Sequence, residues 1–378
     1  FAAAYTLLFF NFISIGEVTR DYFQYADAIF NGVLPFHTFN DMNWEYPPLS
    51  YLVMIPPRFF CNDPITYAYL YMAFITLIII AGLWLVRSFA LKFGFNAKTT
   101  MLLYVVAAVI LNSYFFEKID VVVALVALAA IYMYLSGKYT YAFVLLAFGM
   151  MVKLYPAILF PVFIVPMLAS GKYKESLKQI AVFFGAVALM IIPFIIWSPD
   201  HFLNFITYHN ARGLQIESLA ASIVMVAEMF GLTWTYTTNS FFSFNIEGGP
   251  THILASISFP LMAVAMLVFL VLYFLHCRGL DEDERPKTIA WASLIMLLIF
   301  IIPNKVFSAQ YMDWIVLMVL PMAVCFDSGK MRVPYILLLL TMFMTCLFMA
   351  DYGGICYHDP LVVLILFMRN ILIVLLLL

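Results

Sequence analysis

Long runs of apolar residues follow one another along almost the whole chain, and they constrain the fold more than any other feature. The longest lie at 64–87, 179–197, 252–276 and 361–378. A helix of about 20 apolar residues is long enough to cross a bilayer. Only 11% of the residues are charged, against roughly 25% in a soluble domain. The sequence therefore predicts an integral membrane protein.

The complete pattern predicts an all-α polytopic membrane protein with about 11–12 transmembrane helices. We expect residues 1–378 to form a single membrane domain, and we expect both natural ends to be truncated because apolar runs lie at each end. The short spans 140–153 and 154–170 are expected to form a broken pair around Lys153-Leu154-Tyr155-Pro156. The other predicted spans are 1–14, 99–115, 119–136, 288–303, 311–326 and 333–350.

The basic residues predict which loops face the cytoplasm. Residues 48–60 are too short to cross and contain Pro56-Pro57, so we interpret them as an interfacial or re-entrant helix. If residues 48–60 do not cross the membrane, most basic residues fall in loops on one side, such as the lysine-rich loop 171–178. These loops are assigned to the cytoplasm. The two long loops, 15–63 and 198–251, are then extracytoplasmic, and we expect them to carry interfacial helices and the function.

Several classes of protein and site are disfavoured by composition. The net charge of −2 provides no basic surface for nucleic acid. Five cysteines lack the spacing of a metal site, and no metal is expected. Unpaired thiols are favoured, although a disulfide between Cys61 and Cys356 stays open. No glycine-rich phosphate loop or soluble domain is evident, so an activated donor is expected to arrive through the lipid.

The first long loop contains an acidic and aromatic segment. Thr19 as N-cap and Asn31-Gly32 as a stop predict a helix over about 20–30. Asp21 then falls in the first turn, where the helix dipole favours the ionised carboxylate that a general base requires. The alternative is that Asp21 only caps this helix or pairs with Arg20.

Polar residues at the ends of other spans are candidates for the same site. Tyr46-Pro47-Pro48 is a rigid extended entry that holds Glu45 over a groove, or else marks the start of a helix. Ionisable groups at membrane depth usually face a cavity or one another. The structural alternatives are a Lys118–Asp120 pair and a Lys305–Asp313 pair. Lys153 lies at a proline-broken junction and is more suggestive of function.

Two further segments are rich in polar groups. Residues 208–218 include His209, Arg212 and Glu217, and arginine is well suited to phosphate because its donors form a planar fork. The alternative is an Arg212–Glu217 pair that only fixes the loop. Residues 303–311 are a polar re-entry between spans, where Ser308 and Gln310 can hydrogen-bond a sugar.

Five segments in this order resemble the DUF2029-type polyprenyl-phosphate mannosyltransferases, which form glycosyltransferase family 87 in the GT-C superfamily. The most specific is the Arg-Gly-Leu-Gln-Ile-Glu-Ser run. Ala309 departs from the family pattern, which has proline at that point. The resembling segments are Asp21-Tyr22-Phe23-Gln24-Tyr25, Tyr46-Pro47-Pro48, Lys153-Leu154-Tyr155-Pro156, 212–218 and Phe307-Ser308-Ala309-Gln310-Tyr311.

The resemblance implies a GT-C fold, an extracytoplasmic active site and a polyprenyl-phosphate sugar donor. It also implies that Asp21 is the catalytic base. The expected reaction is an inverting transfer of a sugar, with mannose favoured, to a hydroxyl of a glycolipid or glycan. The donor phosphate is expected to contact Arg212, Lys153, His209 and Lys305. Sugar or acceptor is expected to contact Tyr25, Glu45, Tyr46, Glu217 and Gln310.

This interpretation has consequences for partners and location. The expected partners are membrane lipid, the lipid-linked donor and the acceptor, without nucleic acid or metal. A prokaryotic plasma membrane is favoured over the endoplasmic reticulum. The alternative function is a polytopic transporter or lipid-carrier flippase. It fits less well because the candidate charges lie at the outer boundary, and because the two halves show no repeat.

Overall fold

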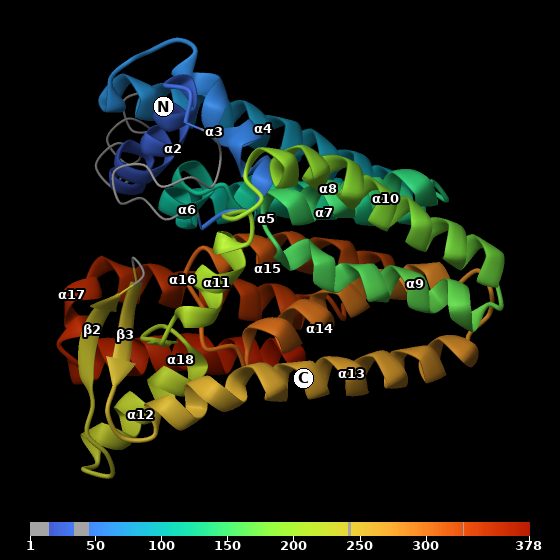
Figure 1. The fold of residues 1–378 in the computed structure, drawn as a ribbon. Coiled ribbons are helices and arrows are strands. Elements are labelled where there is room, and N and C mark those ends of the chain that lie inside the picture. The colour runs from blue at the N-terminus through green and yellow to red at the C-terminus, as the bar shows by residue number, and fades with distance from the viewer. Residues whose placement is uncertain (1–14, 34–44, 241–242, 328) are drawn as a thin grey trace. The chain divides into compact units, whose positions relative to one another are not determined.

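The computed structural model describes residues 15–33, 45–240, 243–327 and 329–378, without the side chains of 208–211. The predicted span 1–14 lies outside the described residues. The chain divides into two compact units, shown with their element labels in Figure 1. Unit 1 comprises Phe1–Phe160 and Tyr173–Asn210, and unit 2 comprises Pro161–Lys172 and Ala211–Leu378.

The described part of unit 1 is built from helices. A π-helical turn, η1, leads directly into α2, and two long helices, α4 and α10, are joined by shorter ones. The elements are η1 Val18–Tyr22, α2 Phe23–Phe30, η2 Pro48–Ser50, α3 Tyr51–Arg58, α4 Pro64–Phe93, α5 Ala97–Ile110, α6 Asn112–Glu117, α7 Asp120–Leu135, α8 Tyr139–Val152, η3 Tyr155–Ile158, α10 Tyr173–Trp197 and α11 Asn204–Ala211.

Unit 2 combines helices with one small sheet. Most of α9, Leu159–Ala169, belongs to it. The other elements are β1 Leu214–Gln215, α12 Leu219–Met229, β2 Tyr236–Ser240, β3 Ser243–Glu247, α13 Thr251–Arg278, η4 Arg285–Thr288, α14 Ile289–Ile301, α15 Tyr311–Val319, η5 Leu320–Val324, α16 Arg332–Ala350, α17 Tyr352–Cys356 and α18 Pro360–Leu377.

The prediction of an all-α polytopic membrane protein is confirmed. Among the described residues, five helices are long and apolar enough to cross a membrane, namely α4, α10, α13, α16 and α18. Shorter apolar helices, including α7 and α8, cover most of the remaining predicted spans. The helix predicted at 48–60 is present as η2 and α3. All five cysteines are free thiols.

Local sequence signals explain where the long helices begin and end. The Asp63 carboxylate accepts the backbone N–H of Thr66 at 2.8 Å and caps α4, whose first residue is Pro64. Gly94 ends the same helix with a φ of 79°, a left-handed conformation that favours glycine. Asp359 caps α18 by accepting the N–H groups of the next helical turn, and Pro360 is its first residue.

The helices of unit 1 pack closely where α4 meets α5 and α7. At Gly82, an added Cβ would lie 2.5 Å from the Tyr104 hydroxyl and 2.6 Å from a methyl group of Leu125. The Tyr104 hydroxyl also donates to the carbonyl of Ile79 at 3.0 Å. Because any larger side chain would collide with both neighbours, Gly82 sets the approach of these helices, as small residues do in membrane bundles.

The predicted break at Lys153-Leu154-Tyr155-Pro156 is present. Helix α8 ends at Val152, and Lys153 is extended, with φ −155° and ψ 135°. The chain then resumes in η3, which has Pro156 in its first turn. Since proline lacks an N–H and restricts the residue before it, the helix cannot run through this point.

The small sheet was not predicted. Its strand order is β1-β3-β2, with antiparallel pairing. In the β2–β3 hairpin Tyr236 pairs with Glu247 and Ser240 with Ser243. The run Tyr236-Thr237-Thr238 combines aromatic and β-branched residues, which favour strands, but it is too short to stand out inside a long loop. Helix α12 is one of the helices expected within the second long loop.

Candidate active site

Asp21 lies on a turn of π-helix, in which the N–H of Phe23 bonds to the carbonyl of Val18. Such turns are rare and are often found at functional sites. Helical backbone is already present at residues 16 and 17, so the prediction that Thr19 caps the helix is wrong. The Thr19 hydroxyl instead donates to the carbonyl of Ile15 at 2.9 Å, four residues back. The predicted helix over 20–30 is otherwise confirmed.

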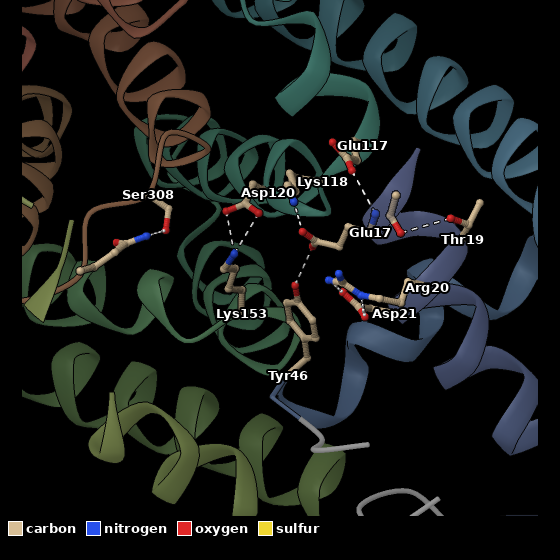
Figure 2. A network of polar contacts seen from close by, with 12 residues as sticks. Glu17, Thr19, Arg20, Asp21, Tyr46, Glu117, Lys118, Asp120, Lys153 and Ser308 are labelled. Atoms are coloured by element: carbon tan, nitrogen blue, oxygen red, sulfur yellow. Dashed lines mark hydrogen bonds and ion pairs between the residues drawn. The ribbon is translucent and has the colours of Figure 1, made fainter. Parts of the chain in front are cut away.

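The Asp21 carboxylate is held by its neighbour Arg20. Arg20 Nε and Nη2 each donate to a different oxygen of Asp21 at 2.7 Å, as Figure 2 shows. The hydrogen bond to Asp21 raises the pKa of Arg20, and the charges of Glu45 and Glu117 add to this effect. The Asp21 side chain is 16% exposed and that of Arg20 is 58% exposed. The carboxylate therefore has a largely exposed cation as partner and is itself partly exposed.

A second carboxylate lies one helical turn before Asp21. Glu17 forms an ion pair with Lys118 and accepts a hydrogen bond from the Tyr46 hydroxyl at 3.3 Å (Figure 2). The backbone N–H of Glu17 donates to Glu117 Oε1, also at 3.3 Å. These contacts join η1, the Tyr-Pro-Pro segment and the end of α6, which are far apart in the sequence.

A third ion pair joins α7 to the break after α8. Lys153 Nζ donates to both carboxylate oxygens of Asp120 at 2.8 Å. Asp120 is only 1% exposed and lies in the first turn of α7, where the helix dipole favours a carboxylate. Lys153 Nζ also lies 5.8 Å from the centre of the Tyr46 ring. Lys118 and Asp120 therefore each have an ion partner on a different element, which the sequence did not indicate.

Tyrosine rings surround these charges. Tyr46 packs edge-on against Tyr22 and Tyr25, with ring centres 6.0 and 6.1 Å apart, and Tyr22 also contacts Tyr71 at 5.4 Å. Burial raises the pKa of Tyr22, Tyr25 and Tyr46 well above the usual value. The phenols therefore stay neutral and serve as hydrogen-bonding and packing groups.

We call this assembly the acidic cluster. Its carboxylates outnumber its cations, so it favours neutral hydroxyl groups over anions. Of the predicted site residues, Asp21, Tyr25, Glu45, Tyr46 and Lys153 belong to it or contact it. Its charged members are Glu17, Asp21, Glu45, Glu117 and Asp120, with Arg20, Lys118 and Lys153.

In unit 2, two of the predicted phosphate ligands lie together. Lys305 Nζ donates to the backbone carbonyl of Arg212 at 2.6 Å. Burial and the nearby Arg212 charge lower the pKa of Lys305. Nε of Arg212 is buried without a hydrogen-bond partner among the described residues. Two adjacent cations of this kind are candidate ligands for an anion.

Glu217 is tightly held by unit 2. Its Oε2 accepts the backbone N–H of Ala309 at 2.8 Å, and its Oε1 accepts the Tyr352 hydroxyl at 3.0 Å. Arg369 Nη2 lies 3.9 Å from Oε2 and donates to the Glu217 carbonyl at 3.3 Å. Burial raises the pKa of Glu217, although Arg369 and the hydrogen bonds oppose this effect. Among the described residues, the ion partner of Glu217 is therefore Arg369, not Arg212.

Gln215 extends these contacts to the polar re-entry. Its Nε2 donates to Ser308 Oγ at 2.8 Å, and its Oε1 accepts the N–H of Phe307 at 2.8 Å. The Arg369 guanidinium lies 3.9 Å from the centre of the Phe307 ring. We call this set the Glu217 network, and its members are Gln215, Glu217, Phe307, Ser308, Ala309, Tyr352 and Arg369.

For two other predicted site residues, Gln310 and His209, the structure gives fewer contacts. Gln310 immediately precedes α15 and is partly exposed. His209 lies in α11, and its side chain is outside the described set. Glu17 and Arg369 were not among the predicted site residues. For Arg369 the signal was a single charge inside an apolar run, which commonly has a buried partner.

No curated protein and no solved structure matches the chain significantly. The model of glycosyltransferase family 87 matches residues 44–303, which is more than half of the chain. Glu45, Lys153 and Arg212 lie inside the matched region, whereas Asp21 and Lys305 lie outside it. On the extent of this match, the chain belongs to glycosyltransferase family 87.

Proposed function

We propose that this chain is an inverting glycosyltransferase that uses a polyprenyl monophosphate-linked sugar, with mannose as the first choice. The acceptor is a hydroxyl of a glycolipid or glycan, and the reaction takes place at the extracytoplasmic face. Family membership supports glycosyl transfer. The observation that carries the proposal further is the partly exposed Asp21 carboxylate, which lies in a tyrosine-lined acidic cluster.

In this mechanism Asp21 is the general base. The acceptor oxygen attacks the anomeric carbon on the face opposite the phosphate, while Asp21 takes the hydroxyl proton. The bond between the anomeric carbon and the phosphate oxygen breaks through an oxocarbenium-like state, and the polyprenyl phosphate leaves with the electron pair. Arg20 must release Asp21 as the acceptor enters, which costs little because the arginine side chain is more than half exposed.

Cationic residues stabilise the departing phosphate. The best supported pair is Arg212 and Lys305, which are adjacent and separate from the acidic cluster by sequence and by unit. Lys153 contributes if it exchanges one Asp120 oxygen for the donor, and His209 is a further candidate. With basic side chains in these roles, the proposed reaction needs no metal.

The residues predicted to contact sugar or acceptor fall into two groups. Tyr25, Glu45, Tyr46 and Gln310 remain proposed contacts for sugar or acceptor. Glu217 was also predicted to contact sugar, but both of its carboxylate oxygens accept hydrogen bonds from within unit 2. We therefore favour a role for Glu217 in positioning the segments that carry Arg212 and Lys305.

The proposal is tested by transfer of label from radiolabelled polyprenyl-phosphate mannose to a membrane lipid extract. Purified wild-type protein is expected to form a new labelled lipid, and Asp21→Ala is expected to form none. Asp27→Asn is the matched control, because Asp27 lies on the adjoining helix α2 and is paired with Arg58 at 2.8 Å. It should keep turnover. Full turnover by Asp21→Ala would remove Asp21 from the mechanism.

A further inference from the structure

Unit 2 displays a group of large apolar side chains on its β-hairpin and the adjoining turns. Phe230 is 74% exposed, Leu232 79%, Trp234 66%, Tyr236 43% and Tyr357 89%. The rings of Trp234 and Tyr236 are 5.4 Å apart. We call these five residues the aromatic patch. Exposed apolar surfaces mark protein-binding or membrane-binding sites when they are large and contiguous.

The end of α12 holds the first two members of the patch in fixed positions. The N–H of Gly231 bonds to the carbonyl of Glu228, and the N–H of Leu232 bonds to that of Ala227. Gly231 has a φ of 69°, and together these features form a Schellman cap. In such caps the residue at the Leu232 position often packs back on its helix. Here it stays exposed, so the cap presents Leu232 outward.

The patch is tied to the start of one candidate span through the hairpin. The Tyr236 hydroxyl donates to Glu247 at 3.0 Å, and Glu247 ends β3. A Cβ at Gly248 would lie only 2.7 Å from the carbonyl oxygen of Trp234. Since α13 begins three residues later, at Thr251, Trp234 and Tyr236 lie beside the beginning of that helix.

A second tie joins the patch to the start of α18. His358 Nε2 lies 3.0 Å from Thr237 Oγ1 on β2, and His358 Nδ1 lies 2.8 Å from Glu228 Oε2 at the end of α12. His358 has a φ of 56°, the one left-handed non-glycine residue in the described ranges. Tyr357 precedes it, and α18 begins two residues after it, at Pro360.

The starts of two spanning helices fix the depth of the patch. α13 has 28 residues and α18 has 18, so at 1.5 Å per residue they are roughly 42 and 27 Å long. The hydrocarbon core is about 30 Å thick, and the bilayer with its headgroups about 40–45 Å. The first residues of both helices therefore fall at or near the headgroup region, and so do Glu247, Gly248 and His358, which tie the patch to the helix starts.

We propose that the aromatic patch inserts into the boundary between lipid headgroups and acyl chains and anchors this loop on the membrane. Tryptophan and tyrosine favour that boundary because their rings are apolar and their edges are polar. Phe230 and Leu232 have no polar group with which to bind a sugar, which favours lipid over a glycan as the occupant. The inference does not depend on the reaction proposed above.

Nitroxide labels can measure this depth on the full chain in phosphatidylcholine–phosphatidylglycerol nanodiscs. Labels are placed separately through Phe230→Cys and Leu232→Cys, with Asp283→Cys, in the exposed charged loop, as the aqueous control. Wild-type protein treated in the same way gives the background from the native cysteines. Collisions with oxygen, which concentrates in lipid, are compared with those of a water-soluble nickel chelate.

The patch predicts an oxygen-to-chelate ratio several-fold higher at positions 230 and 232 than at 283. A ratio equal to that at 283 would overturn the proposal. A second result would also overturn it: labels that are exposed to water in nanodiscs and that collide less with both reagents when oligosaccharide is added. That result would identify the patch as a glycan-binding surface. Quenching by brominated lipid gives an independent test, because Trp234→Phe should remove part of the quenching seen in wild type.

Discussion

The acidic cluster of unit 1 and the Glu217 network of unit 2 are both built around carboxylates, but they hold them differently. Among the described residues, the ion partner of Asp21 is the exposed neighbouring Arg20, and Asp21 is partly exposed itself. Glu217 is 5% exposed, and its two oxygens accept hydrogen bonds from a backbone N–H and a tyrosine. A carboxylate that exchanges its partner can do chemistry, whereas one fixed on all sides shapes the protein.

The comparison also shows that the segment most typical of the family need not consist mainly of catalytic residues. The Arg-Gly-Leu-Gln-Ile-Glu-Ser run was the most specific resemblance to the family, yet its Gln215 and Glu217 are committed to internal contacts. Its arginine is the member that stays available for an anion. A distinctive motif can therefore be largely a folding motif, with Arg212 as its one proposed functional side chain.

The largest expected effect is on the stability of unit 2. In Glu217→Ala, Arg369 would be left fully buried without its carboxylate, at a cost of about 3–5 kcal/mol. The double variant Glu217→Gln with Arg369→Met should recover part of this loss. Thermal unfolding measured by size-exclusion in detergent gives the comparison, with Glu247→Gln as the exposed-carboxylate control. Equal midpoints for Glu217→Ala and Glu247→Gln would show that the network is not structural.

The next prediction distinguishes two roles of Lys153, namely binding of the donor phosphate and pairing with Asp120. Lys153→Met should lower kcat/KM by about 10–100-fold if this lysine contacts the donor phosphate, since a hydrogen bond to a charged group contributes about 1.5–3 kcal/mol. It should also destabilise unit 1, because Asp120 is left buried without its lysine partner.

Adding Asp120→Asn to Lys153→Met removes the buried negative charge and is expected to restore the unfolding midpoint. The steady-state KM for the donor should remain raised in this double variant. A return of both the midpoint and KM to wild-type values would restrict Lys153 to a structural role.

A smaller effect is expected from Arg212→Lys. The positive charge is kept, but the planar donor fork that matches a phosphate is lost. We expect donor affinity to fall about tenfold, which corresponds to about 1.4 kcal/mol. Donor binding can be measured by microscale thermophoresis with a non-transferable analogue, so that turnover does not interfere. Unchanged affinity would place the phosphate away from Arg212.

The smallest effect is a shift in pH dependence. Lys305 binds a phosphate only when protonated, and its pKa is lowered by burial and by the charge of Arg212. Donor affinity should therefore fall as the pH rises through this lowered pKa. In Arg212→Gln the electrostatic cause is removed while the burial remains, so the alkaline limb should move to higher pH. If the alkaline limb of the pH profile does not move, the charge of Arg212 does not affect the pKa of Lys305.

The sequence predicted most of the helices because apolar runs, caps and prolines act locally. The break at Pro156 was predicted, whereas α4 runs on to Phe93, beyond its predicted span of 64–87. The position of Thr19 was misjudged, since a threonine can cap a helix or bond to a carbonyl within one. The β2–β3 hairpin was missed because its short strands show no long alternating pattern.

The candidate site was only partly predictable, because its contacts join distant segments. Lys118 pairs with Glu17 across 101 residues, and Arg369 meets Glu217 across 152 residues. No local pattern specifies such partners: of the charge pairs proposed from sequence proximity, Arg20–Asp21 is present, whereas Lys118 and Asp120 pair with other elements. Asp21, in contrast, could be selected because it is an acidic residue in a short amphipathic helix at a membrane boundary.

The central claim is that chemistry depends on Asp21 while Glu217 supports the fold. The most direct test measures turnover and the unfolding midpoint together for Asp21→Asn and Glu217→Gln. We expect Asp21→Asn to lose about 10²–10⁴-fold in kcat with an unchanged midpoint, as for removal of a general base. Glu217→Gln should lower the midpoint and keep measurable turnover at low temperature. Retained turnover in Asp21→Asn, with a normal midpoint, would contradict the account.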